Sequence, residues 1–216
     1  MKTESNRLRK MTVILTVAVS LSLGASRCGV PDSEIRLSHA IKFDGPNGKR
    51  LMELVPRGQR VKLENARGEL VVRFRLEAGR LRIELASREL VGFVAPQAAD
   101  TGGLQVVGAR GASVLYRLRR EPDGDLKLQD GAGRTVYEVK LRDYGFKTVD
   151  ARGAVQSRVR VKPTKVSVRD AAGKTTLSTD DSIPPPAAAC FTLNGLPLEF
   201  QTGLALAIIH WGASSL

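Results

Sequence analysis

Three turn sequences spaced 20 residues apart decide the fold. Residues 126–179 read LKLQDGAGRTVYEVKLRDYGFKTVDARGAVQSRVRVKPTKVSVRDAAGKTTLST, in which DGAG starts at 130, DARG at 150 and DAAG at 170. The aspartate of such a turn can hydrogen-bond to its own backbone two residues on, and the glycine accepts the positive φ that hairpin loops require. Each turn therefore predicts a β-hairpin, with Gly133, Gly153 and Gly173 at positive φ.

The same register continues towards the N-terminus. Related turns, one of them degraded, start at 45 (GPNG), 65 (NARG), 85 (LASR) and 108 (GARG), which makes seven units in all. Self-similarity at a fixed period marks a repeat architecture. The segments between the turns alternate apolar and polar residues, as in VVRFRL at 71–76. This period of two predicts strands with one apolar face and one polar face.

The C-terminal segment has a different pattern. The alternation ends at SIPPP (182–186), because consecutive prolines cannot continue a central strand. Residues 197–211 are then apolar on nearly every side, with Glu199, Gln201 and His210 as the main exceptions. A helix that is apolar all round belongs in a core or in a membrane. The segment is shorter than the roughly 20 residues that span a bilayer, which favours a core helix over a C-terminal membrane anchor.

The size of the sheet indicates where this helix lies. Seven hairpins supply about 12 to 14 strands. Side chains alone fill a barrel of about eight strands, whereas wider barrels leave a lumen. The sequence therefore predicts an all-β fold with one helix. It is a 12–14-stranded antiparallel β-meander barrel of 20-residue hairpin repeats, which encloses the apolar helix at 197–211.

The N-terminus has the features of a secretory signal peptide. Four basic residues among the first ten precede an uncharged run, MTVILTVAVSLSLGA (11–25), which small residues follow. We expect a signal peptide over 1–26, a short linker over 27–34 and a single domain over 35–216. The protein is then exported to the periplasm or cell envelope, where nucleic acid is not an expected partner.

The two cysteines have alternative fates. Cys28 lies just behind the apolar run, and the sequence ASRC (25–28) resembles a bacterial lipobox, except that Arg27 stands where a small residue is required. Lipidation of Cys28 would anchor the chain to a membrane. A Cys28–Cys190 disulfide is an alternative in an oxidising compartment. A buried, unreactive Cys190 is the simpler expectation.

Cations gather on the predicted polar faces. The chain has 34 Lys and Arg against 22 Asp and Glu, a formal charge of +12. Alternate strand positions hold Arg73 and Arg75, Arg117 and Arg119, Lys140 and Arg142, and Arg158 and Arg160. The residues expected to point inward beside them are Phe74, Leu118, Leu141, Val159 and Val161. The pattern fits a solvated strand surface with edge-protecting cations, or a surface that binds phospholipid or another envelope polyanion.

No catalytic or metal-binding pattern stands out. Metal sites need several His, Cys or carboxylate ligands at suitable spacing, and the only histidines in the sequence are His39 and His210. Cys190 and His210 could form a nucleophile–base pair, but both lie in the apolar C-terminal segment, where packing roles are commoner. We expect a non-enzymatic protein without a cofactor.

The hairpin motifs and the apolar helix together resemble the tubby C-terminal-like superfamily, which includes the LURP-one-related proteins and the phospholipid scramblases. The resemblance rests on LKLQDGAG (126–133), VSVRDAAG (166–173) and GLALAII (203–209). It implies a 12-strand barrel threaded by a C-terminal helix, over roughly residues 35–212. The signal peptide is a departure, because most members act inside cells. No residue here matches the phosphoinositide contacts of tubby.

A second resemblance is to RHS/YD repeats. These also recur at about 20 residues with Asp-x-x-Gly-Arg turns, as in DGAGR at 130–134. They usually place Tyr before the Asp, where this chain has Gln129, Val149 and Arg169, and they run to far more repeats.

These patterns lead to one functional expectation and two alternatives. We expect a non-enzymatic cell-envelope module that binds or lies against an anionic surface, with phospholipid as a candidate. The alternatives are a structural or protein-interaction lipoprotein without a small ligand, and an RHS/YD-like repeat fragment. The sequence leaves the ligand and the oligomeric state open.

Overall fold

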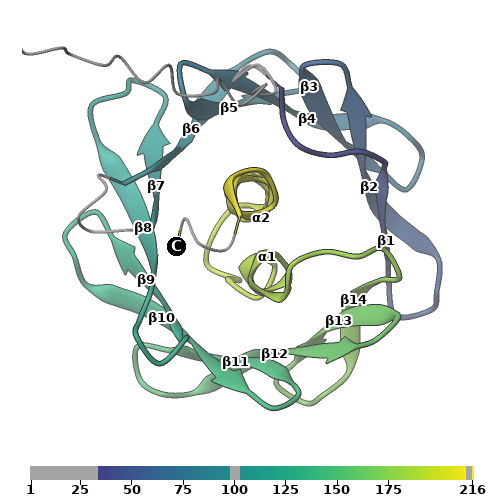
Figure 1. The fold of residues 1–216 in the computed structure, drawn as a ribbon, viewed down its shortest axis with the longest axis vertical. Helices are drawn as coiled ribbons and strands as arrows, with labels where there is room; N and C mark the ends of the chain where they lie inside the picture. The colour runs from purple at the N-terminus through teal and green to yellow at the C-terminus, as the bar shows by residue number, and fades with distance from the viewer. Residues whose placement is uncertain (1–33, 98–102, 213–215) are drawn as a thin grey trace, which may run out of the picture.

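The computed structural model describes residues 34–97, 103–212 and 216, and the predicted signal peptide (1–26) and Cys28 lie outside them. Strands form a closed ring around two helices in a view down the shortest axis of the molecule (Figure 1). Over the described ranges, no helix is long and apolar enough to cross a membrane.

Fourteen antiparallel strands make up the ring in the described part of the chain, and each pairs with its neighbours in sequence until β14 closes on β1. This order confirms the predicted antiparallel meander barrel. The strands are β1 (Ile41–Asp44), β2 (Arg50–Arg57), β3 (Arg60–Asn65), β4 (Leu70–Glu77), β5 (Arg80–Leu85), β6 (Leu90–Pro96), β7 (Leu104–Gly108), β8 (Val114–Arg120), β9 (Leu126–Asp130), β10 (Thr135–Arg142), β11 (Gly145–Asp150), β12 (Val155–Lys162), β13 (Lys165–Asp170) and β14 (Thr175–Thr179).

The seven repeat turns each join an odd-numbered strand to the next even-numbered one, so all lie at the same rim of the barrel. Gly133, Gly153 and Gly173 have φ values of 83°, 80° and 87°, as predicted. In the degraded copy Arg88 takes the glycine position at φ 74°. The Asp150 carboxylate accepts hydrogen bonds from two backbone N–H groups of its turn, each at 2.9 Å. The sequence motif therefore encodes the turn directly.

A β-bulge or similar irregularity accompanies every repeat turn. The pairing register shifts in each of the seven hairpins that these turns close. A loop that ends with a residue in the left-handed region commonly forms such a bulge. Bulges bend the strand and increase its twist, which helps a sheet to curve and close. One motif thus provides both the reversal of the chain and the curvature of the wall.

The inward faces of the strands and the helix α2 (Leu198–Trp211) form one apolar core. Leu204, Leu206 and Ile208 are fully buried inside the ring, as predicted for this segment. Gly203 lets the helix approach the wall, because an added Cβ would lie only 2.7 Å from Cδ1 of Ile83. The helix begins at Leu198, one residue after the predicted start at 197.

A short helix, α1 (Pro185–Cys190), precedes α2 and was not predicted from the sequence. The prolines that end the β pattern also begin this helix, because proline has a fixed φ that suits a first turn and needs no hydrogen-bond donor there. Ala187 to Cys190 are buried. The helix α1 packs against α2 and β11–β13, whereas α2 packs against β5–β7. The interior of the barrel therefore holds two helices.

The expected inward positions need one correction. Phe74, Leu118 and Val159 are buried and Val161 is half-buried, but the side chain of Leu141 is 42% exposed. Val139 on the same strand is buried. Leu141 lies two residues further along β10, at the rim opposite the repeat turns, although Phe146 directly opposite it on β11 is buried. Alternation alone does not show which side chains at the end of a strand are covered.

Candidate anion-binding surface

The eight cations predicted from the sequence lie on the outer wall, on even-numbered strands: Arg73 and Arg75 on β4, Arg117 and Arg119 on β8, Lys140 and Arg142 on β10, and Arg158 and Arg160 on β12. Even-numbered strands are never adjacent in this ring. The residues on the intervening odd-numbered strands therefore determine whether neighbouring cations are neutralised or join into a positive surface.

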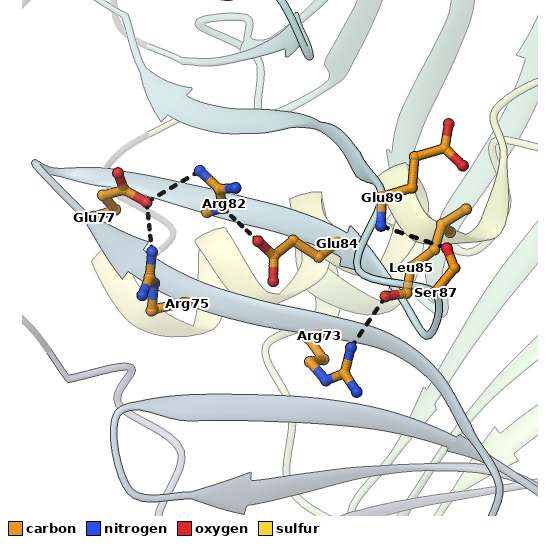
Figure 2. A network of polar contacts seen from close by, with 8 residues as sticks. All are labelled: Arg73, Arg75, Glu77, Arg82, Glu84, Leu85, Ser87 and Glu89. Atoms are coloured by element: carbon orange, nitrogen blue, oxygen red, sulfur yellow. Dashed lines mark hydrogen bonds and ion pairs between the residues drawn. The ribbon is translucent and has the colours of Figure 1, made fainter.

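Carboxylates offset half of the positive charge on β4 and β5, where Glu77 and Glu84 lie among four arginines and pair with two of them. Arg75 donates to Glu77 at 2.9 Å, and Arg82 reaches Glu77 at 3.5 Å and Glu84 at 2.7 Å (Figure 2). The hydrogen bond from Arg75 lowers the pKa of Glu77, with a further contribution from the charge of Arg82. The hydrogen bond to Glu84 raises the pKa of Arg82. We call the outer side of β4 and β5 the neutralised face.

Three of the predicted arginines also hold repeat turns in place. Arg73 donates to the carbonyl oxygen of Ala86 at 3.1 Å, Arg117 to that of Gly131 at 3.3 Å, and Arg158 to that of Ala171 at 2.9 Å. Each acceptor lies in the repeat turn of the next hairpin. A guanidinium has five N–H donors, so each side chain keeps donors and its full charge for other contacts.

Two other predicted cations have carboxylate partners. Arg119 donates to Glu121 at 2.9 Å, and Lys140 lies 3.1 Å from Glu138. Arg142 donates to the carbonyl oxygen of Leu141.

Four cations lie side by side across β10–β13, on the side of the barrel away from the neutralised face (Figure 1). Lys140 is opposite Lys147, Lys147 is opposite Arg158, and Arg158 is opposite Arg169. Paired strands lie about 4.8 Å apart, so there is one cation per strand around this part of the wall. We call these four residues the basic row. Like charges directly opposite one another are destabilising, so the row costs the fold some stability.

Few carboxylates compensate the basic row. Lys140 has Glu138, but in the described part of the chain Lys147, Arg158 and Arg169 form no ion pair, and neither does Arg160. The Nε atom of Arg169 is buried, and no protein acceptor among the described residues reaches it.

Members of the basic row line two shallow grooves. The first, of about 470 Å³, includes Lys140, Arg142 and Lys147 together with Glu138 and Asp150. Hydrogen bonds from its own turn, that of Ala154 N–H first, lower the pKa of Asp150, which therefore stays ionised.

The second groove is the more basic one. It has a volume of about 280 Å³, and its lining, among the described residues, is Tyr144, Arg158, Arg160, Arg169 and Gly173. We call it the arginine groove. It contains three guanidinium groups and no carboxylate, which makes it the strongest candidate for an anion site.

The other candidate residues have packing contacts. Cys190 is buried and donates to the carbonyl oxygen of Pro186 at 3.5 Å, and burial raises its pKa, so the thiol stays protonated. This confirms the expectation of a buried Cys190. The Nδ1 atom of His210 accepts a hydrogen bond from the backbone of Arg36 at 3.2 Å. Among the described residues no group of three His, Cys, Asp or Glu could hold a metal ion.

Sequence reasoning missed Lys147 and Arg169, because neither has a second cation two positions away on its strand, so neither makes a repeated pattern. The length of a turn could have revealed Lys147. A two-residue loop at 143–144 pairs Arg142 with Gly145, and counting back along both strands places Lys140 opposite Lys147. Arg169 follows in the same way from the loop at 163–164.

Comparisons with known proteins assign neither a family nor a function. No family model matches the chain, and no curated protein does. Among solved structures, a protein from Arabidopsis thaliana is similar at 13% identity and a TM-score of 0.38, over 76% of this chain and 91% of that one. BamB from Moraxella catarrhalis is similar at 11% identity and a TM-score of 0.28, over 59% and 66%. The wall, its two helices and its unequal charge are therefore the basis for any statement about function.

Proposed function

We propose that this protein is a non-enzymatic cell-envelope module that binds an anionic surface, with phospholipid headgroups as the main candidate, through the basic row. The observation that carries the proposal is the direct cross-strand register of Lys140, Lys147, Arg158 and Arg169. An anionic membrane attracts basic residues at roughly 1 kcal/mol per cation near its surface. Several cations on one side of the wall are then enough for measurable binding.

The unequal charge of the wall supports attachment in one orientation. Two glutamates offset half of the positive charge on the β4–β5 side, whereas only Glu138 pairs with a member of the basic row in the described part of the chain. A membrane would therefore attract one side of the barrel more than the other. The protein would lie with β10–β13 towards the lipid.

The proposal has two further parts, which concern export and family membership. We propose a signal peptide at 1–26, with lipidation of Cys28 as a further anchor, and membership of the tubby C-terminal-like superfamily on the strength of the barrel, its repeated hairpins and its interior helix. Intact-mass measurement of the protein from its native host tests the first part. A processed or lipidated chain supports export, and an unprocessed cytoplasmic chain that begins at Met1 would overturn it.

Vesicle binding tests the proposed surface. Wild-type protein should sediment with phosphatidylcholine vesicles that contain phosphatidylglycerol, and should bind less at high salt, because screening weakens surface electrostatics. The variant Arg158→Glu/Arg160→Glu should bind at least roughly tenfold more weakly, since two attractive charges become repulsive. Its matched control is Arg73→Glu/Arg75→Glu, which has the same change in charge and the same spacing on β4, and in which the first arginine also holds a repeat turn.

The control variant distinguishes a localised surface from general attraction by a basic protein. It should keep most of the wild-type binding. Equal losses in the two variants would show that net charge alone matters. Binding of the wild type that does not depend on phosphatidylglycerol, or no binding at all, would favour the alternative of a structural or protein-interaction module.

A further inference from the structure

The arginine groove has an uncompensated concentration of charge. Arg158 and Arg169 are directly opposite on β12 and β13, and Arg160 follows on the same side of β12. In the described part of the chain none of the three has a carboxylate partner. The buried Nε of Arg169 also lacks an acceptor there. Buried polar groups in proteins are nearly always hydrogen-bonded, and each exception calls for an explanation such as an external partner.

Contacts within the wall hold parts of the groove in place. The Arg158 guanidinium donates to the carbonyl oxygen of Ala171 at 2.9 Å, which fixes its position beside the β13–β14 turn. The carbonyl oxygen of Tyr144 accepts a hydrogen bond from the backbone of Val161 at 2.8 Å, which ties the β10–β11 turn to β12. The side chain of Tyr144 is 36% exposed and lines the groove, so its hydroxyl can serve as a further donor.

Three guanidinium groups suit one kind of anion best. A guanidinium presents its N–H donors in a planar fork that matches two oxygens of a phosphate or carboxylate. A carboxylate has one charge and two oxygens, and one fork is enough to bind it. A terminal phosphoryl group has three oxygens and carries about −1.5 to −2 charges at neutral pH, so it can engage several arginines together.

We propose that the arginine groove is a discrete binding site for a terminal phosphoryl group. Arg158, Arg160 and Arg169 supply the charge and paired hydrogen bonds, and Tyr144 supplies a hydroxyl donor. This inference rests on the proposed function and deepens it. It adds a saturable site of defined stoichiometry to a surface that otherwise attracts anions through charge alone. The phosphoryl group could come from a lipid headgroup or from a free phosphate ester.

Titration with inorganic phosphate tests the site directly. We expect the wild-type protein to bind one phosphate, measured by calorimetry and by shifts of the arginine Nε–H signals in NMR spectra. Arg169→Lys keeps the charge but removes the fork, and should weaken phosphate binding at least tenfold. The matched control is Arg75→Lys, the same substitution on the neutralised face, which should leave phosphate binding unchanged.

Vesicles distinguish the two sources of the phosphoryl group. If the source is a lipid, wild-type protein should prefer vesicles with phosphatidic acid over phosphatidylglycerol vesicles of matched surface charge, and Arg169→Lys should remove that preference. Saturable phosphate binding without the preference supports a free phosphate ester as the ligand. No saturable phosphate binding by the wild type, or undiminished binding by Arg169→Lys, would overturn the discrete site.

The same variant separates this inference from the proposed function. Binding to phosphatidylglycerol vesicles depends on charge and should survive Arg169→Lys. If the protein binds these vesicles but has no phosphate site, the discrete site is wrong and the proposed function stands. If the protein binds phosphate but not these vesicles, the discrete site stands and the proposed membrane surface is wrong.

Discussion

Two hairpins on opposite sides of the barrel, β4–β5 and β12–β13, have the same framework but differ in surface charge. The first has two glutamates among four arginines, whereas the second has one aspartate among five Lys and Arg residues. Equivalent positions lie 85 residues apart, so Arg73 and Arg75 on β4 correspond to Arg158 and Arg160 on β12. Their pairing registers also correspond. Arg73 is opposite Glu84, whereas Arg158 is opposite Arg169, the residue equivalent to Glu84.

The difference between the hairpins is confined to the outer positions. The central inner positions are apolar and buried in both, with Phe74 and Ile83 in one hairpin and Val159 and Val168 in the other. A cross-strand pair of opposite charges contributes about 0.2–1 kcal/mol, and a like-charge pair destabilises. The β12–β13 hairpin gives up this contribution, and such local conflicts in a consistent fold tend to mark functional sites. The repeat therefore specifies the barrel but leaves the surface charge of each unit free to vary.

The largest expected effect concerns the core that both hairpins share. Leu206 on α2 is fully buried. Leu206→Asp should abolish cooperative folding, because an unpaired buried charge costs several kcal/mol. Circular dichroism during urea unfolding measures this. Leu198→Asp is the control on the same helix, at a side chain that is 40% exposed, and should fold. A cooperatively folded Leu206→Asp protein would mean that α2 is not part of the core.

The next effect concerns the repeat turns that come just before the two hairpins in the chain. Gly68 and Gly153 occupy equivalent repeat turns at φ 76° and 80°, and an added Cβ at either would meet no atom within 4 Å. Gly68→Val and Gly153→Val should therefore each cost roughly 1–2 kcal/mol from backbone strain alone, with similar shifts of the urea midpoint. Arg88→Gly, the reverse change at φ 74°, should not destabilise. Clearly unequal costs for the two valine variants would show that their turns are not equivalent.

Sequence periodicity predicted the features that depend on one strand at a time. The repeat, the positive φ of Gly133 and the buried α2 follow from local patterns, because turn chemistry and the apolar period act within a few residues. The cross-strand neighbours did not follow in the same way. Whether Arg158 faces a glutamate or Arg169 depends on the length of the loop at 163–164. Whether Lys147 faces Arg158 depends also on the bulge in the β11–β12 hairpin, which shifts the register.

The interior was incompletely predicted for a related reason. The pattern showed that an apolar segment must fill the barrel, but the triple proline marked both the end of the sheet and the start of α1. Leu141 was assigned to the core because its strand alternates, but alternation does not show which side chains at the end of a strand are covered.

A reciprocal substitution at Glu84 and Arg169 would exchange the character of the two hairpins. Arg169→Glu places a carboxylate opposite Arg158, as in β4–β5, and should raise the free energy of unfolding by about 0.2–1 kcal/mol. It should also weaken binding to phosphatidylglycerol vesicles. Glu84→Arg should destabilise by at least as much, because it places two arginines opposite each other and removes the carboxylate that pairs with Arg82. Urea unfolding at low and high salt measures both effects, which should shrink as salt screens the charges. Effects of the same sign in both variants would show that packing, and not charge, separates the hairpins.

The smallest expected effect concerns acid pH, which should act unequally on the two hairpins. The hydrogen bond from Arg75, with the charge of Arg82, lowers the pKa of Glu77. The carboxylate therefore stabilises the fold above the ordinary glutamate pKa of about 4.3, and this contribution is lost as the pH falls through the lowered folded-state value. The equivalent residue on β12 is Lys162, so this position has no carboxylate to protonate.

Glu77→Gln should accordingly lose less stability than the wild type on acidification, as measured by the urea midpoint between about pH 5 and pH 3. Part of the acid dependence should remain, because turn hydrogen bonds also lower the pKa of Asp130 and of Asp150. Lys162→Gln, the equivalent change on β12, should leave the acid dependence of the wild type intact. Parallel pH profiles for the wild type and Glu77→Gln would mean that Glu77 has the same pKa in the folded and unfolded chains. The contacts of Glu77 with Arg75 and Arg82 in Figure 2 would then add nothing to the stability of the neutralised face.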